Sequence, residues 1–289
     1  MYCYALSCIH IHEEGMDMKR MKLWVALMLA LALMLPVVAM ADKLADVKAS
    51  GKLLVGTSIN FPPFEFWYDD PVTKEQKLEG FEMKLAEGLA AELGVEFVPV
   101  DQAFSGLITE LRAGSIDVII SGMVMKPDRV ELVDFSTPFF FGKQVMLVHK
   151  DKADTYKTVE SINGQKLGVQ MGALQVELAA EQFPASEAMQ LDSIPTLIME
   201  LAMGNVEGVI LADSVAASYA KVNPNIVISE IPVAYSTAGV GIAVAKSEDN
   251  ASFLEAINAY LEKVLADGTF EKWVDEAYEI NGLLLQESK

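Results

Sequence analysis

Residues 80–94 read GFEMKLAEGLAAELG, and this stretch decides which kind of fold the chain can adopt. Leu85, Leu89 and Leu93 recur at i, i+4 and i+8, so the spacing predicts a helix over 81–93 with one buried stripe. Gly94 is typical of the residue that ends a helix in the left-handed conformation. The segment is therefore predicted to be an amphipathic helix, packed by one face against the rest of a domain.

Short apolar segments alternate with amphipathic ones along the rest of the chain. Predicted strands cover 53–57, 95–100, 118–121, 144–149, 166–169, 209–212, 226–228 and 240–245. Predicted helices cover 81–93, 106–113, 173–182, 194–203, 214–221, 252–266 and 268–277, and Pro127 opens a further short one. This alternation is typical of parallel sheets with crossover helices, so the predicted fold class is α/β.

Two long extended segments divide this pattern. FSTPFFFGKQVMLVHK over 135–150 passes from one α/β block to the next, and YSTAGVGIAVAK over 235–246 leads back. Two such crossings predict two lobes joined by a two-strand hinge, with a ligand cleft between the lobes. The expected boundaries are 42–143 with 240–289 for lobe 1, and 144–239 for lobe 2.

Residues 1–41 are predicted to be a leader with a signal peptide. Lys19, Arg20 and Lys22 precede the apolar stretch 23–38, and a small-x-small site ends at Ala41. A retained membrane anchor is the less favoured alternative. MYCYALSCIHIHEEG at the very start fits neither a signal nor a fold element, so we expect that translation begins at a later methionine.

Composition excludes several classes of function. The net charge is −19, and a surface this acidic repels nucleic acid. Cys3 and Cys8 both lie in the leader, and His149 is the one histidine that follows it. The mature chain therefore has no disulfide, no cysteine nucleophile and no three-histidine zinc site, and we expect neither a metal nor a cofactor.

A first candidate wall for a ligand lies in GTSINFPPFEF, residues 56–66. Pro62 and Pro63 force an extended loop after the strand that ends near Gly56. The three phenylalanines of this loop can each pack in the core or border a cleft at the carboxyl end of a parallel strand.

A second candidate is SGMVMKPDRV, residues 121–130. The backbone of Ser121, Gly122, Met123 and Val124 follows a strand and can receive an anion, and Arg129 can add a bidentate guanidinium fork. Spacing alone favours the plainer alternative, in which Arg129 is a solvated helix residue paired with Glu131 or Asp134.

A third candidate is Asp213 in VILADSVAAS, residues 209–218. A helix N-cap is the simpler explanation of an aspartate at the start of a helix. The functional alternative is a carboxylate that projects into the cleft and receives an ammonium group.

Taken in order, these motifs resemble the polar amino-acid-binding family of periplasmic solute-binding proteins, which serve ABC importers. The resemblance runs from about Lys52 to Tyr278 and includes LEGFEMKLAEGLAAELG, FSGLITELRAGSIDVIISGMVMKPDRVELVDFSTPF, GQKLGVQMG and LADGTFEKWVDEAY. It implies the two-lobed periplasmic-binding-protein fold, a periplasmic location after signal cleavage, and a monomer that delivers its ligand to a membrane permease.

The resemblance also implies roles for single residues. Arg129 matches the arginine that clamps the ligand α-carboxylate, and Asp213 matches the acid that takes the α-ammonium from the other lobe. The remaining matches are cleft walls and backbone groups that meet the ligand: Ser58, Phe61, Phe104, Ser121, Gly122, Met123, Val124, Gly172, Ala173 and Leu174.

Several positions depart from the family pattern. The family usually has a hydroxyl residue where Val124, Lys126, Ala173 and Leu174 stand, and an acid where Lys84 stands. Ser58 occupies a position that is acidic in members binding basic amino acids. These departures favour a neutral, more apolar α-amino acid as the ligand.

Two other functions stay open from the sequence. Some proteins resembling this family are dehydratases acting on prephenate-like or arogenate-like acids, and Glu177 lies one turn beyond the second-lobe turn where they need an acid. A ligand-binding protein that reports to a membrane receptor is the other alternative. The resemblance favours the non-enzymatic transport function.

Overall fold

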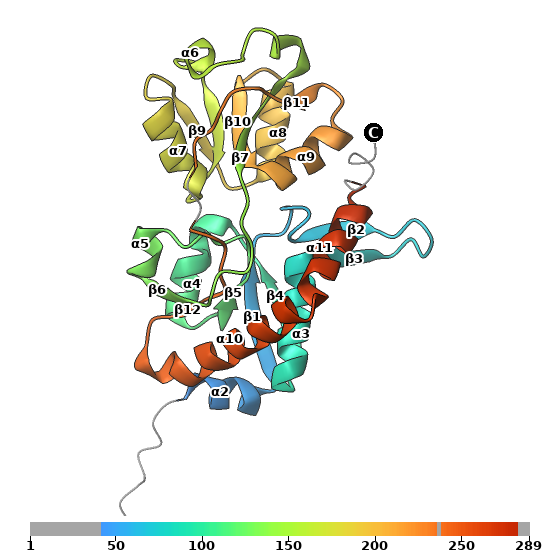
Figure 1. The fold of residues 1–289 in the computed structure, drawn as a ribbon, viewed down its shortest axis with the longest axis vertical. Coiled ribbons are helices and arrows are strands. Elements are labelled where there is room, and N and C mark those ends of the chain that lie inside the picture. The colour runs from blue at the N-terminus through green and yellow to red at the C-terminus, as the bar shows by residue number, and fades with distance from the viewer. Residues whose placement is uncertain (1–41, 236–237, 283–289) are drawn as a thin grey trace, which may run out of the picture. The chain divides into compact units, whose positions relative to one another are not determined.

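The computed structural model describes residues 42–235 and 238–282, and the predicted leader over 1–41 lies outside them. Within the described residues the chain builds two five-stranded sheets and a two-stranded hairpin (Figure 1). Among the helices of this part, none has both the length and the apolar character needed to cross a bilayer.

The first sheet has the strand order β4-β1-β5-β12-β6. Its strands are β1 (Lys52–Thr57), β4 (Glu96–Asp101), β5 (Val118–Ile119), β6 (Val133–Phe135) and β12 (Ala243–Ala245). β1 pairs in parallel with β4 and β5, whereas β12 runs antiparallel to β5 and β6. β12 belongs to the return segment, so it enters this sheet from the opposite direction.

The second sheet has the strand order β11-β7-β10-β8-β9. Its strands are β7 (Gln144–His149), β8 (Leu167–Gln170), β9 (Ala188–Leu191), β10 (Gly208–Ala212) and β11 (Ile226–Ile228). β8 pairs in parallel with β9 and β10, and β7 lies antiparallel between β10 and β11. β7 is the strand with which the chain first enters this sheet.

The two crossing segments meet each other. An antiparallel bridge joins Phe140 to Val240, and a second one joins Val124 to the same residue. The Val240 N–H donates to Phe140 O at 2.8 Å, and the Phe139 N–H donates to Val240 O at 2.9 Å. The segments on either side of the second sheet therefore run together as a short paired ribbon.

Helices cover both sheets (Figure 1). Packed around the first sheet are α2 (Lys43–Ser50), α3 (Phe81–Leu93), α4 (Leu107–Ala113), α10 (Ala251–Ala266) and α11 (Thr269–Ile280). The second sheet carries α7 (Leu174–Gln182), α8 (Ile194–Ala202) and α9 (Asp213–Val222). Short turns of helix occur at η1 (Phe104–Gly106), α5 (Pro127–Val130) and α6 (Val159–Ile162).

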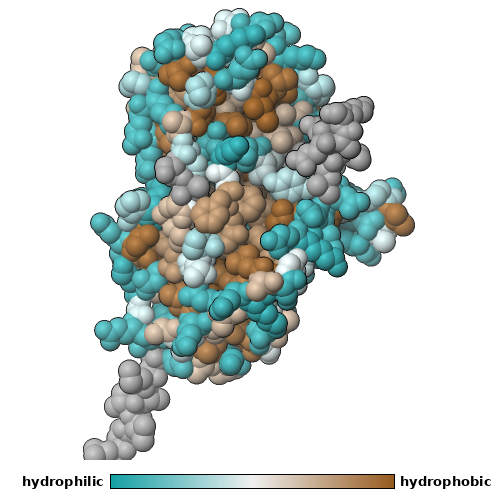
Figure 2. Space-filling model, viewed as in Figure 1, coloured by the Kyte–Doolittle hydropathy of each residue, from teal (hydrophilic) through white to brown (hydrophobic). Residues whose placement is uncertain are grey.

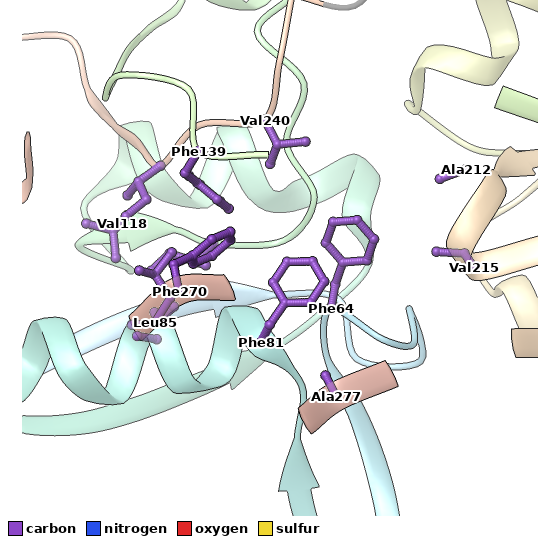
Figure 3. Close-up of a cluster of buried hydrophobic side chains, with 14 of the residues drawn as sticks. Phe64, Phe81, Leu85, Val118, Phe139, Ala212, Val215, Val240, Phe270 and Ala277 are labelled. Carbon is purple, nitrogen blue, oxygen red and sulfur yellow. The ribbon is translucent and has the colours of Figure 1, made fainter. Parts of the chain in front are cut away.

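The helix predicted from residues 80–94 is confirmed. Leu85 and Leu89 are fully buried, Leu93 is nearly so, and Gly94 ends α3 with φ of 75°. Phe81 opens the helix and stacks near Phe64, with 4.4 Å between their ring centroids (Figure 3). This aromatic cluster anchors α3 against the loop that follows β1.

Most predicted elements are present, with shifted ends. The structure places β7, β11 and α3 at their predicted residues. The predicted strands 118–121 and 240–245 are shorter, because β5 ends at Ile119 and β12 begins at Ala243. The sequence pattern missed the hairpin β2 (Phe66–Asp69) with β3 (Gln76–Glu79), and also β6, β9, α2 and α6.

Candidate functional site

A pocket of about 630 Å³, partly open to solvent, lies where segments of the two sheets meet. From the first-sheet side it is lined by Ser58, Phe61, Phe64, Glu65, Phe104, Ser121, Gly122, Val124 and Arg129, and from the crossings by Phe140, Gly142 and Val240. The second-sheet side and its return contribute Gln144, Gln170, Ala173, Leu174, Gln175, Ala212 and Tyr235.

The pocket brings together most of the residues that the sequence singled out. Nine of them are in its lining: Ser58, Phe61, Phe104, Ser121, Gly122, Val124, Arg129, Ala173 and Leu174. Met123, Gly172 and Asp213 are outside it. Met123 is 1 % exposed and packs in a core cluster with Phe104 and Ile119 instead.

Arg129 is buried, so the prediction of a solvated surface arginine is wrong. It is 4 % exposed, and among the described residues it forms no ion pair with Glu131 or Asp134. Its Nη1 donates to Val124 O at 2.9 Å and its Nη2 to Gly172 O at 3.0 Å. These bonds use two of five N–H groups, and the others remain for a ligand carboxylate.

The surroundings of Arg129 strengthen its interaction with an anion. Its guanidinium lies 5.2 Å from the ring centre of Phe104, which fits a cation–π contact. Burial lowers the pKa of Arg129 to about 10, and this still leaves the group charged at neutral pH. Asp128 and Glu177 act on Arg129 electrostatically, but among the described residues no carboxylate lies within ion-pair distance of it. A buried cation whose charge is not paired directly is a strong site for a carboxylate ligand.

Gly122 allows the ring of Phe61 to approach the loop after β5 closely. Its φ is 56°, and a Cβ there would lie 2.7 Å from Cε1 of the Phe61 ring. Glycine is the residue that adopts this conformation without strain and leaves room for the ring. The ring of Phe61 therefore packs directly on the loop that follows β5, and both line the pocket.

The turn before α7 meets Arg129 from the second-sheet side. Gly172 has φ of 73° and presents its carbonyl to the guanidinium. Ala173 is the N-cap of α7 and has no side chain that could cap the helix. The start of α7 thus faces the pocket with apolar side chains where the family usually has hydroxyls.

Asp213 is the first residue of α9, and its predicted N-cap position is taken by Ala212. Its Oδ1 accepts a hydrogen bond from the Ser214 N–H at 2.8 Å. A Cβ on the pocket-lining Gly142 would lie 3.6 Å from this oxygen. The carboxylate therefore lies next to Gly142, one of the residues that line the pocket.

Several lining residues were missed by the sequence reasoning. Gln144, Gln170 and Gln175 line the second-sheet side, and Gln175 Nε2 donates to Gln144 Oε1 at 2.8 Å. Gln170 Nε2 donates to Asp192 O at 3.2 Å. Nothing in the local sequence distinguishes these buried amides from surface ones, because strand alternation alone does not say which face borders a cleft.

Besides the Arg129–Gly172 hydrogen bond, other polar contacts join segments of the first-sheet and second-sheet sides. Ser105 Oγ donates to Asp192 Oδ1 at 2.7 Å, and Tyr219 Oη donates to Asn60 O at 2.7 Å. Lys126, 7 % exposed, pairs with Glu177 of α7 and lies 3.3 Å from Asp128 Oδ2. Glu177 is therefore engaged by a cation outside the pocket lining.

Neutralising Glu177 should weaken ligand binding, because the Lys126–Glu177 pair holds the two sides of the pocket together. For Glu177→Gln we expect Kd to rise about 2- to 5-fold at low salt, as for a half-exposed ion pair, and less at high salt. Isothermal titration at two salt concentrations measures this. The control is Glu181→Gln, because Glu181 is an exposed acid one turn further along α7. Equal Kd values for the two variants would show that the Lys126–Glu177 ion pair does not contribute to ligand binding.

Among residues 42–235 and 238–282, no group of three or more His, Cys, Asp or Glu side chains is placed to hold a metal ion. The pocket lining supplies one cation, one buried carboxyl group, amides and aromatic rings. This set suits recognition of a small zwitterion by charge, hydrogen bonds and apolar contact.

Two α/β lobes, joined by two crossings and lining one pocket from both sides, define a solute-binding protein. The comparison with known families agrees. Residues 53–279 match the family described as bacterial extracellular solute-binding proteins, family 3, and the chain belongs to this family.

Known members resemble it over most of their length. The ABC transporter arginine-binding protein 1 of Escherichia coli (strain K12) is 30 % identical over 229 residues, which cover 79 % of this chain and 91 % of that protein. The amino acid ABC transporter substrate-binding protein AbpA from Streptococcus pneumoniae, bound to L-arginine, matches with a TM-score of 0.77 and 27 % identity, covering 82 % and 98 %.

A third similar protein bears on the enzyme alternative. The ancestral amino acid-binding protein AncCDT-1, a precursor of cyclohexadienyl dehydratase, matches with a TM-score of 0.74 and 30 % identity, covering 82 % of this chain and 100 % of that one. It is itself described as an amino acid-binding protein. The relatives named here are thus binding proteins, two of them from ABC transporters.

Proposed function

We propose that this chain is the extracytoplasmic substrate-binding component of an amino-acid ABC importer. It binds a free α-amino acid between its lobes and delivers it to a membrane permease. Buried Arg129, with unused N–H groups facing a pocket lined from both sides, is the observation that carries this proposal. The chain works as a monomer in the periplasm after removal of residues 1–41.

The lobes of this proposal are 42–143 with 240–289, and 144–239. The paired ribbon at Phe140 and Val240 supports a hinge there, because both crossings pass through it. The α-carboxylate binds Arg129, and the α-ammonium binds Asp213 when the lobes close. A ligand that bridges both lobes binds the closed form better, and this difference in affinity drives closure.

The ligand side chain is neutral. Among the lining residues, Glu65 is the one with a carboxyl group, and it is fully buried and bonded to Ser121. A cationic side chain would therefore find no free carboxylate in the lining. The amides of Gln144, Gln170 and Gln175 can exchange hydrogen bonds with a neutral polar side chain such as that of glutamine.

A thermal-shift series tests both parts of the proposal. Protein is unfolded and refolded to remove any bound ligand, then mixed with L-glutamine, L-leucine, L-arginine or buffer. Binding stabilises the folded state by about 2.7 kcal/mol when the ligand is at 100 times its Kd. We expect L-glutamine or L-leucine to give the largest shift, and a larger shift with L-arginine would overturn the neutral class.

The same protein should not convert prephenate or arogenate. Glu177, in the first turn of α7, is held by Lys126 and does not line the pocket. Chromatography of overnight reactions with each acid measures product directly. Product formation that disappears in Glu177→Gln would support the dehydratase instead of the transport function.

A further inference from the structure

Two glutamates near the pocket are completely buried. Glu65 ends the loop after β1 and lines the pocket, and Glu82 is the second residue of α3. Among the described residues, neither has a lysine, arginine or histidine within ion-pair distance. Buried carboxyl groups without a cation are costly unless they are protonated or fully hydrogen-bonded.

The backbone holds these two residues next to each other. The Glu82 N–H donates to Phe64 O at 3.1 Å, and the Phe81 N–H donates to Pro63 O at 3.2 Å. Gly80 makes this possible, since its φ is 127° and a Cβ there would lie 2.0 Å from Phe64 O. The dipeptides Phe64-Glu65 and Phe81-Glu82 thus lie side by side, rings together and carboxyl groups together.

One oxygen of each carboxyl group is bound to the loop that follows β5. Ser121 Oγ donates to Glu65 Oε1 at 2.7 Å, and the Gly122 N–H donates to Glu82 Oε2 at 2.8 Å. Ser121 Oγ in turn accepts from the Ser58 N–H at 2.9 Å. Ser58, Ser121 and Gly122 all line the pocket, so the carboxyl pair holds one of its walls.

The other oxygen of each carboxyl group is buried and accepts no hydrogen bond among the described residues, although the Thr57 hydroxyl lies near Glu65. These oxygens are Glu65 Oε2 and Glu82 Oε1. Two ionised carboxyl groups side by side would repel each other, and among the described residues no cation is paired with either of them. A single proton satisfies both, because one oxygen then donates and the other accepts.

The electrostatics of the pair agree with this geometry. Burial, and next the charge of Glu82, raise the pKa of Glu65 well above its ordinary value, and burial raises the pKa of Glu82. The other groups acting on Glu65 are the hydroxyls of Ser121 and Thr57. No other charged side chain acts on either group among the described residues, so the pair depends on its own proton.

We propose that Glu65 and Glu82 share one proton at neutral pH and act as positioning residues, fixing Ser58, Ser121 and Gly122 in the pocket wall. Loss of the proton at alkaline pH leaves two repelling carboxylates and loosens that wall. The inference of a shared proton depends on the structure alone. The inferred effect of this proton on ligand affinity depends also on the proposed amino-acid-binding function.

Glutamine substitutions distinguish a shared proton from two independent acids. In Glu65→Gln the amide oxygen accepts from Ser121, and its nitrogen supplies the missing donor to ionised Glu82. In Glu82→Gln the amide oxygen accepts from the Gly122 N–H, and the amide nitrogen donates to ionised Glu65. In the double variant, either amide orientation leaves the Ser121 hydroxyl or the Gly122 N–H without an acceptor, so one buried donor is unsatisfied.

The stability arm uses urea unfolding from pH 6 to pH 10 without ligand. In this pH range the folded protein keeps the shared proton, whereas the unfolded chain releases it. The free energy of unfolding therefore falls as pH rises, until the pH exceeds the raised pKa of the pair in the folded state. We expect the wild-type unfolding constant to rise relative to that of each single variant, up to about tenfold per pH unit. The double variant should unfold at lower urea than either single variant at pH 7.

Glu87→Gln, an exposed acid on α3, is the matched control and should keep the wild-type pH profile. Infrared spectra supply a second readout, since wild type at pH 7 should show a protonated-carboxyl C=O band that both single variants lack. Parallel pH profiles for wild type and Glu65→Gln, or absence of this band from wild type, would overturn the shared proton.

The binding arm titrates wild type and Glu65→Gln with L-glutamine at pH 7 and pH 9. Ionisation of the free amino acid affects both proteins equally, so the difference reports on the pair. We expect wild type to lose several-fold more affinity between these pH values than Glu65→Gln does. Equal losses would overturn the positioning role, whereas no binding at either pH would contradict the proposed ligand and leave the stability arm intact.

Discussion

Arg129→Met should raise the Kd for the bound amino acid by roughly two to three orders of magnitude. Removing one partner of a buried, hydrogen-bonded charge pair costs about 2–5 kcal/mol, largely because the ligand carboxylate is left buried without its cation. The guanidinium is 4 % exposed and has N–H groups left for the ligand. Isothermal titration with the tightest-binding amino acid measures the loss.

The control for this prediction is Arg112→Met, because Arg112 is an exposed arginine on α4. It should bind like the wild type. Arg129→Met also frees the carbonyls of Val124 and Gly172, so its unfolding free energy is expected to change by up to about 3 kcal/mol, which urea unfolding checks separately. Wild-type affinity in a folded Arg129→Met protein would refute the carboxylate site.

Phe81→Ala should destabilise the protein by about 3–5 kcal/mol, the range for deleting a buried aromatic ring. The Phe81 ring is fully buried between three others, with centroid distances of 4.4 Å to Phe64, 5.2 Å to Phe140 and 5.8 Å to Phe270 (Figure 3). Helix α11 carries Phe270, so the cavity would also loosen the C-terminal helix. Urea unfolding of the ligand-free protein gives the free energy difference.

Phe141→Ala is the comparison, because Phe141 is 59 % exposed and lies close in sequence to the same aromatic cluster. Its loss should cost less than about 1 kcal/mol. Similar losses for both variants would mean that the ring cluster around Phe81 does not carry the stability of the first sheet.

Local sequence pattern was sufficient for most of the longer helices and for the general architecture, although α2 and α6 were missed. The leucine stripe of α3 and the glycine that ends it act over one or two turns, and Gly94 adopts the left-handed conformation predicted for it. Hydrophilic residues cover much of the visible face, with patches of hydrophobic residues between them (Figure 2).

Short elements without a pattern of their own were missed. β6 and β9 are strands of three and four residues that exist because a neighbour supplies their hydrogen bonds. The hairpin of β2 and β3 is interrupted by Asp70 and Pro71, which read as loop residues in isolation. Pairing with a distant strand is not encoded within such a short window.

The position of the pocket depended on the family resemblance as well as on the residues. The family resemblance indicated nine residues that line the pocket. One of them is Arg129, which residue spacing alone predicted to be solvated. The resemblance did not indicate the amides of Gln144 and Gln175, nor that Lys126 is buried and paired with Glu177. These features are particular to how this chain packs, so they follow from its own tertiary contacts.

The sequence by itself determined the α/β class, most of the longer helices and the absence of cysteine after residue 41, because these depend on composition and on contacts between near neighbours. Only the tertiary structure decided that Arg129 is buried and that Glu65 meets Glu82. The charge state of a side chain depends on which groups replace its water, and here those groups come from loops more than fifteen residues apart. Folding therefore turned two ordinary glutamates into a buried pair with a single proton to share.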